Sequence, residues 1–190
     1  MSTNNNYTKA NFVRIWKGAL AYLSSIDIAA KVLELAQDRG NDAWSPGDAT
    51  YYDSENPAWQ FKRGTIGIDD IVEDECPMIM IDVLNWPHQK PRKAGDNYSQ
   101  EWGIDMLICI AALGPSQEDA EIRSLDAACA IINAWTGGGS NLNMNRSLTG
   151  LDYTALSGGG WITQKRNDQY LSLGQIVLSV GTRVRFNNPS

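Results

Sequence analysis

The spacing of hydrophobic positions predicts two helices near the N-terminus. Between Asn11 and Leu23, apolar residues recur every three or four positions, and Thr8 precedes them at an N-cap position. The same spacing resumes at Ile28 and ends before Gly40, and glycine is a common helix stop. The pattern therefore indicates either a second helix or a kinked continuation of the first.

The next segment, from Asn41 to Pro77, has no such periodicity. It is rich in Pro, Gly, Asn and Asp, which favour turns, and it carries the aromatic residues Trp44 and Trp59. We expect a long irregular connection at about residues 41–77 that contains at most one short strand.

Two apolar runs then predict a β-hairpin. Met78 to Leu84 has the length and the flanking residues of a buried strand, and Trp102 to Leu113 is apolar on both faces at its centre. The residues between the two strands, Trp86 to Gln100, are polar and include several basic side chains. The sequence thus predicts an antiparallel hairpin with a long, basic tip.

A third helix follows this hairpin. Ser116 and Asp119 form a capping box, and a glycine run from Gly137 ends the helix. The spacing of large apolar residues predicts that its buried face consists of Ile122, Leu125, Cys129, Ile132 and Trp135.

The C-terminal part reads as strands. Leu151 to Leu156 forms one, and Trp161 to Arg166 pairs with Gln169 to Phe186 through a turn at Asn167-Asp168. Gly174 marks a bulge in the last strand. The glycine runs at 137–139 and 158–160 are expected in turns or loops, since neither precedes a helix as a phosphate-binding loop does. The whole chain, 1–190, is therefore predicted to be one α+β domain, an antiparallel sheet with helices packed on one face.

Composition and charge narrow the classes of function. The 16 Lys and Arg residues against 22 Asp and Glu give a net charge of −6, which disfavours sequence-independent nucleic-acid binding. The longest apolar stretch, Met106 to Leu113, is far shorter than the roughly 20 residues of a membrane span. We expect a protein made in a cytoplasm and not placed in a membrane.

Candidate catalytic and metal chemistry is sparse. His88 is the single histidine, and Cys76, Cys109 and Cys129 are widely spaced, so we expect no zinc site, with Cys109 and Cys129 acting as small core residues. The acidic residues at 69–75 lack the spacing of a calcium loop and are expected to form a solvated surface. No catalytic residue, metal ligand or cofactor site is predicted.

Interface residues are the remaining candidates. Trp44, Trp59 and Trp86 lie outside the regular elements, where they either anchor protein contacts or fill the core. The predicted hairpin tip adds His88, Lys90, Arg92 and Lys93, which suit an acidic partner surface or a solvated loop tip. Charge is uneven along the chain, with acidic residues in excess before residue 140 and basic residues in excess after it, which suits head-to-tail contacts between copies.

In its element order and apolar pattern, the chain resembles the tail-terminator and neck proteins that join head and tail in tailed bacteriophages. The parts that carry this resemblance are the helix Phe12 to Leu23, the strand Pro77 to Val83, the polar hairpin loop, the strand Trp102 to Leu113, the helix Ser116 to Trp135 and the last strand ending at Phe186.

The resemblance implies a non-enzymatic virion subunit that assembles into a ring, often a hexamer, capping the tail tube and joining it to the head connector. Its partners would be itself, tail-tube and head-connector proteins, with at most weak, non-specific contact with passing DNA. The long 41–77 segment departs from the family and leaves another neck or tail-tube subunit as an alternative. A small cytoplasmic hydrolase or ligand-binding protein that uses the 69–75 carboxylates is the alternative from a different class.

Overall fold

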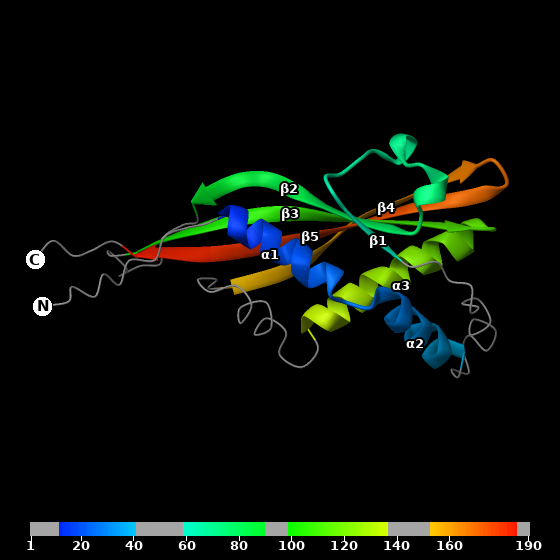
Figure 1. Cartoon of the computed structure of the whole chain (residues 1–190), viewed down its shortest axis with the longest axis horizontal. Coiled ribbons are helices and arrows are strands. Elements are labelled where there is room, and N and C mark those ends of the chain that lie inside the picture. Colours follow the sequence, from blue (N-terminus) through cyan, green and yellow to red (C-terminus); the bar gives the residue numbers. More distant parts are fainter. Residues whose placement is uncertain (1–11, 41–58, 90–98, 137–152, 186–190) are drawn as a thin grey trace, which may run out of the picture.

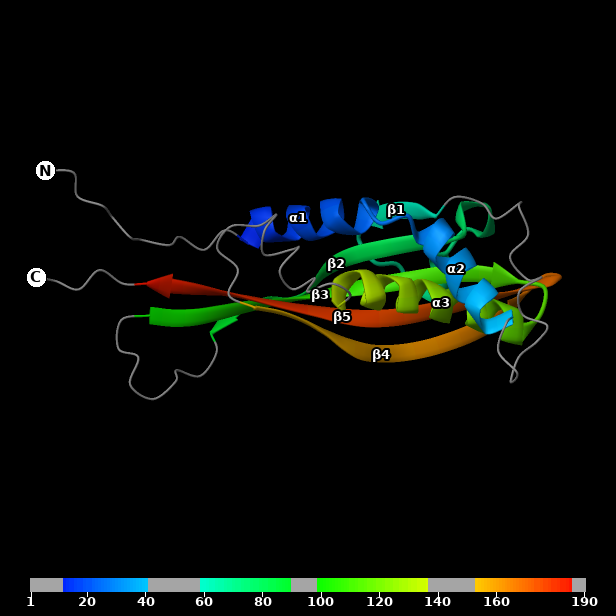
Figure 2. The ribbon, with the colours of Figure 1, turned by 90° about the horizontal axis from the view of Figure 1, so that it is seen from below.

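The protein, described here by a computed structural model, is a five-stranded sheet with three helices on one face (Figures 1 and 2). The structure describes residues 12–40, 59–89, 99–136 and 153–185. Its elements are α1 (Phe12–Ser24), α2 (Ile28–Gly40), β1 (Gln60–Arg63), the short 3₁₀ turns η2 (Ile68–Asp70) and η3 (Glu73–Glu75), β2 (Met78–Gln89), β3 (Ser99–Gly114), α3 (Gln117–Thr136), β4 (Tyr153–Arg166) and β5 (Gln169–Arg185).

The order of strands in the sheet is β1-β2-β3-β5-β4. Every neighbouring pair is antiparallel except β1 and β2, which run parallel, so the α+β prediction is confirmed but the sheet is mixed. A parallel pair needs a crossover of about a dozen residues or more. Residues 64–77, which carry η2 and η3, supply it on the face away from the helices (Figure 1). Sequence reasoning treated this segment as irregular and so missed the crossover.

The two N-terminal helices are separate elements. Asp27 lies in the break between them, where its Oδ1 accepts a hydrogen bond of 3.0 Å from the backbone N–H of Ala30 and caps α2. The prediction of a second helix is therefore confirmed, and the alternative of a kinked continuation is wrong.

The main hydrophobic core lies between the sheet and the three helices. Strands β2, β3 and β5 contribute alternate residues such as Ile81, Ile108 and Leu178, each at most 1% exposed. A smaller cluster on the opposite face joins Met80, Cys109 and neighbouring residues under the 64–77 crossover. The central strands are thus covered on both faces where the crossover lies, as their two apolar faces predicted.

Helix α3 begins as predicted but buries a different face. Ser116 Oγ accepts a 3.1 Å hydrogen bond from the Asp119 N–H, which confirms Ser116 as the N-cap. The Asp119 carboxylate accepts a 2.6 Å bond from the Ser116 hydroxyl, whereas in a full capping box it would accept from the Ser116 backbone N–H. Leu125 is 45% exposed and Ile132 38%, and Cys129 is exposed too, so most of the predicted apolar face and the core role of Cys129 are wrong. The buried positions are mainly small: Ala120, Ser124, Asp126, Ala127, Ala128, Ala130, Ile131 and Trp135.

The last hairpin also differs in detail. Residues 151–166 were expected as two short strands, yet β4 is continuous from Tyr153 and contains the 158–160 glycine run that was expected in a loop. The register of β3 with β5 is unbroken past Gly174, so the bulge predicted there is absent. The irregularity lies instead in β4, between Gly158 and Trp161. The predicted pairing through Asn167 is confirmed, and the 137–139 run lies outside the described residues.

The β2–β3 hairpin is longer than predicted. β2 continues to Gln89, so Trp86 and His88 belong to a strand and not to the hairpin loop. β3 and β5 extend past the helices and form a narrow arm at one end of the molecule (Figures 1 and 2). The sheet is therefore longer than the helical layer that covers it.

Candidate subunit interface

The structure brings together few of the interface residues predicted from the sequence. Lys90, Arg92, Lys93 and Trp44 lie outside the described residues. The backbone of β2 carries Trp86 and pairs His88 with Gly103 of β3. Trp59 is half-buried and packs against the helix-side core, so the structure favours its core role over an exposed anchor.

Strand β4 forms one edge of the sheet. Its inner side pairs with β5, and no described strand pairs with its outer side. Residues 157–162 are all exposed, including Ile162 at 53% and Trp161 at 37%. Its first charged residue is Lys165, near the turn. A long edge with unpaired backbone groups and few charges is a ready template for pairing with another chain.

The bulge in β4 is fixed by the side chain of Trp161. Its indole lies against Gly174, where an added Cβ would come within 2.5 Å of Cε2 of the ring. The indole Nε1–H donates a 2.9 Å hydrogen bond to Ser124 Oγ of α3, which lies 2.8 Å from Ser172 Oγ and donates at 3.0 Å to the Glu121 carbonyl. The Ser124 hydroxyl thus uses its one proton and both lone pairs.

A second contact ties β4 to α3. Thr163 Oγ1 donates a 2.8 Å hydrogen bond to Glu121 Oε1, and Gln117 Nε2 donates to the same oxygen at 2.9 Å. Hydrogen bonds from Gln117 and Thr163 stabilise the charged carboxylate and lower the pKa of Glu121. The edge strand is therefore held on its helix side, and none of the strands that the structure describes covers its outer side.

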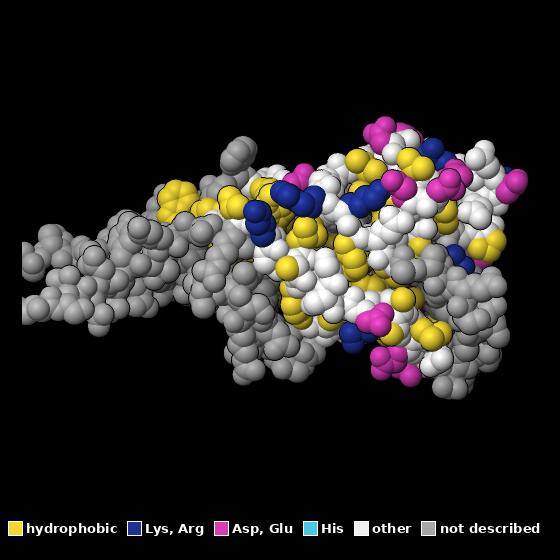
Figure 3. Space-filling model, viewed as in Figure 1, with side chains coloured by type: hydrophobic (Ala, Val, Ile, Leu, Met, Phe, Trp, Pro, Cys, Tyr) yellow, Lys and Arg dark blue, Asp and Glu magenta, His cyan; other side chains and the backbone are white. Residues whose placement is uncertain are grey.

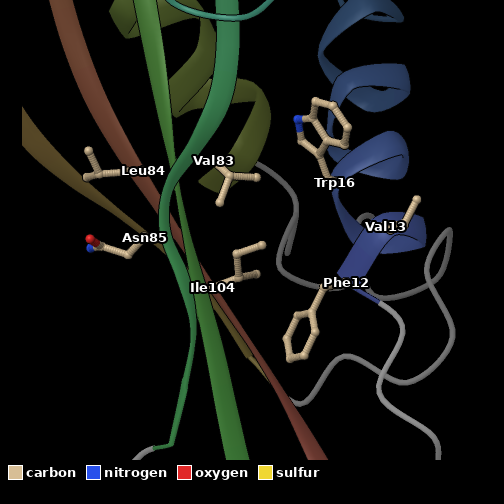
Figure 4. Close-up of a pocket in the computed structure, with 7 residues that line it drawn as sticks. All are labelled: Phe12, Val13, Trp16, Val83, Leu84, Asn85 and Ile104. Atoms are coloured by element: carbon tan, nitrogen blue, oxygen red, sulfur yellow. The ribbon is translucent and has the colours of Figure 1, made fainter.

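An apolar groove lies where the start of α1 meets the sheet (Figure 4). Its volume is about 310 Å³. Phe12 and Trp16 point from α1 toward the sheet, and Val83 and Ile104 point from β2 and β3 toward the helix. The described residues that line it are Phe12, Val13, Trp16, Val83, Leu84, Asn85 and Ile104, and none of them has an ionisable side chain.

One basic side chain lies against a lining residue of this groove. The guanidinium carbon of Arg63 lies 3.9 Å from the centre of the Trp16 ring. Lys17 is exposed and follows Trp16 on α1. The groove is therefore apolar, with the Arg63 cation against one of its lining residues and the Lys17 cation next to that residue in the sequence.

Residues 66–75, here called the acidic segment, project from the opposite face of the sheet. The segment carries five carboxylates, at 69, 70, 73, 74 and 75, and Figure 3 shows acidic side chains gathered over this part of the molecule. Val72 is 54% exposed and Ile66 38%. The carboxylates lie on the surface, as the sequence predicted, and none lines the groove.

Several long-range contacts fix the acidic segment. Ile71 is buried against the second cluster, and the Nη2 group of Arg166 donates a 2.6 Å hydrogen bond to the Ile68 carbonyl. Glu75 pairs with Lys62 at 2.6 Å, and Asp69 lies 3.8 Å from Arg166. Among the described residues, Asp70 and Asp74 have no cationic partner. The segment thus keeps uncompensated negative charge on a fixed backbone.

The cysteines and acidic residues assemble no reactive centre in the described part of the chain. Burial raises the pKa of the Cys109 thiol to about 11, and burial and the adjacent Glu75 raise that of Cys76 to about 11, so both are protonated at neutral pH. Within the described ranges, no three or more His, Cys, Asp or Glu residues are grouped to hold a metal ion. None of the described helices has the length and apolarity needed to cross a membrane.

No protein-family model matches the chain, and no curated protein is significantly similar to it.

Proposed function

We propose that the protein is a structural subunit of a tailed-phage virion, a tail terminator that forms a ring on the tail tube and joins it to the head connector. The observation that carries the proposal is the open outer side of β4, a 14-residue edge strand fixed to the core by Trp161. Such an edge suits a subunit whose unpaired backbone groups are covered by a neighbour.

The projecting arm supports the same function. β3 and β5 pair as far as Ser99 and Arg185, beyond the helices, where a sheet gains little from its own core. An element of this kind is well placed to contact an adjacent subunit or the tail tube. The net charge of −6 also suits a ring through which DNA passes, because few phosphate contacts mean little retention of the DNA.

The first test is the solution mass of the purified protein by light scattering, with electron microscopy of the same sample. We expect a closed ring, or a monomer that forms a ring when tail tubes are added. A compact monomer or dimer that never joins a tube and binds a specific small ligand would contradict the proposal and favour the ligand-binding alternative.

The edge strand can be tested separately. Ala155 and Ser157 are exposed and share one face of β4, so the double substitution Ala155→Lys and Ser157→Lys charges the edge, as natural edge strands do to prevent pairing. We expect a folded monomer with reduced ring formation. Leu33→Lys, at a 37% exposed position on α2, is the matched control and should assemble normally.

A further inference from the structure

We propose that the apolar groove beside α1 binds the acidic segment, residues 66–75, of a second copy of this chain. The two surfaces lie on different parts of one subunit, toward opposite ends of its long axis and on opposite faces of the sheet (Figures 1 and 2). A contact between two different surfaces is head-to-tail, and repeating it builds a ring or a filament. This inference deepens the proposed ring function and rests on it for closure of the ring.

The groove and the acidic segment fit each other in shape and polarity. The groove offers about 310 Å³ of apolar space, at the lower end of the roughly 300–1,000 Å³ range of ligand pockets. The acidic segment presents Val72 at 54% and Ile66 at 38% exposure on a projecting crossover. One or two aliphatic side chains are the kind of group that such a groove accommodates, and burying them removes apolar surface from water on both sides.

The charges near the groove and on the acidic segment are opposite in sign. Arg63 lies over Trp16 of the groove and Lys17 is the exposed neighbour of Trp16 on α1, whereas Asp70 and Asp74 flank Val72 without a cationic partner among the described residues. Docking Val72 in the groove would bring these opposite charges to the rim of one contact, where they favour the correct partner and orientation. The same carboxylates would repel a second acidic segment, which disfavours a symmetric contact between two such segments.

The acidic segment is already held in one conformation before binding. Contacts from β4 and from the turn after it hold the acidic segment: Arg166 to Ile68, Gln164 to Asp69 at 3.2 Å and Asn167 to Glu73 at 3.5 Å. The buried Ile71 anchors its centre. A segment that is already fixed loses little conformational entropy on binding.

Two substitutions break the two halves of the contact. Phe12→Asp places a carboxylate in the groove, at the first residue of α1 where the helix dipole favours it, and Val72→Asp charges an exposed position. We expect each variant to stay folded by circular dichroism and to require at least about tenfold more protein for assembly, since burying the new charge is unfavourable. Asp38→Lys, at an exposed position on α2, is the control and should assemble normally.

Mixing the two variants identifies the contact as head-to-tail. The Phe12→Asp chain keeps an intact acidic segment, and the Val72→Asp chain keeps an intact groove. An equimolar mixture should therefore regain one groove–segment contact for each pair of chains, and its mass by light scattering should rise above that of either variant alone. Variants that had merely unfolded could not complement each other in this way.

Charge reversal tests the rim. Lys17→Glu should weaken assembly, and adding Asp74→Lys in the same chain should restore it in part, with both effects reduced at high salt. Rings of wild-type size from all single variants would overturn this contact while leaving the ring function intact. Open filaments of wild-type protein that the variants disrupt would support the contact and contradict the ring.

Two further outcomes would overturn the contact. If the variants self-assemble normally but no longer attach to tail tubes, the groove binds a tube protein instead of a second copy. A wild-type protein that stays monomeric at all concentrations, with and without tail tubes, would contradict both the contact and the ring.

Discussion

The two edges of the sheet differ in length, charge and cover. β1 is four residues long, carries Lys62 and Arg63, and has both cations engaged, one with Glu75 and the other over the ring of Trp16. β4 is 14 residues long, and its exposed part runs through three glycines to Trp161 and Ile162. Short, charged edges resist pairing with other chains, whereas long, uncharged ones permit it.

The two edges therefore differ in how readily they can pair with another chain. The β1 edge is closed by features that natural sheets use against aggregation, and the crossover leads the chain away from it. The β4 edge has a firm attachment to its own core but no such protection on its outer side. Any assembly by strand pairing should therefore use β4.

The largest effect on stability is expected from detaching β4 from β5. A Cβ at Gly159 would overlap the carbonyl oxygen of Gln175 in β5, whereas a Cβ at Gly160 meets nothing within 4 Å. We expect Gly159→Ala to destabilise the protein by about 1–3 kcal/mol and to loosen β4. Gly160→Ala is the matched control and should change the stability by about 0.5 kcal/mol or less. Chemical denaturation and hydrogen exchange of β4 amides measure both; equal effects would contradict the assignment of the bulge.

A smaller loss of stability is expected when the indole N–H of Trp161 is removed. Trp161→Phe keeps an aromatic ring against Gly174 but removes the hydrogen bond to Ser124 Oγ. The loss should be about 1 kcal/mol from the hydrogen bond, plus a contribution from the smaller ring. In a Ser124→Ala background the hydrogen-bond part should vanish, so a double-mutant cycle by denaturation isolates it. Additive effects of the two substitutions would show that the hydrogen bond contributes nothing.

At the β1 edge of the sheet, the expected change in stability is smaller still. Lys62 and Glu75 form an ion pair 2.6 Å long, with side chains 34% and 41% exposed. Exposed pairs contribute about 0–1 kcal/mol, so Lys62→Met should lower stability by at most that amount, and less in high salt. Removing this edge cation should also leave β1 more prone to pairing, which light scattering at increasing concentration would detect. A loss of several kcal/mol would mean that the β1 edge depends on this pair.

The smallest change in stability is expected at Glu121, whose carboxylate links α3 to the helix side of β4. Hydrogen bonds lower its pKa in the folded protein, so its contribution to stability is present above its ordinary pKa and is lost as the pH falls through the lowered value. Thr163→Val should raise this pKa toward its ordinary value, as followed by NMR titration. Gln117 should sustain part of the shift, and Gln117→Ala with Thr163→Val should abolish it.

Much of this fold could be predicted from local pattern. The three helices, the N-cap at Ser116 and the pairing of β4 with β5 follow from periodicity and turn residues. These features depend on neighbours in sequence, which a single chain displays directly.

The errors arose where distant parts of the chain meet. On α3, large apolar residues suggested one face, but alanines and Ser124 allow close approach to the sheet and α2 covers another side, which leaves Leu125 exposed. Gly174 was expected at a bulge, but a glycine is needed there because the ring of Trp161, across the hairpin, leaves no room for a Cβ. The groove is lined by residues of α1, β2 and β3, which lie far apart in the sequence, so no local pattern could predict that they come together.

The long pairing of β3 with β5 has a consequence for how the chain folds. β2–β3 and β4–β5 are hairpins of neighbouring segments, whereas β3 and β5 meet only after the whole of α3 has been accommodated between Gly114 and Tyr170. Closing that loop costs conformational entropy, and the long ladder of backbone hydrogen bonds offsets this cost only after β3 and β5 have paired. We therefore expect the joining of two preformed hairpins to limit the folding rate, so that substitutions within either hairpin slow folding, while those at β3–β5 contacts that form only after the hairpins meet mainly speed unfolding.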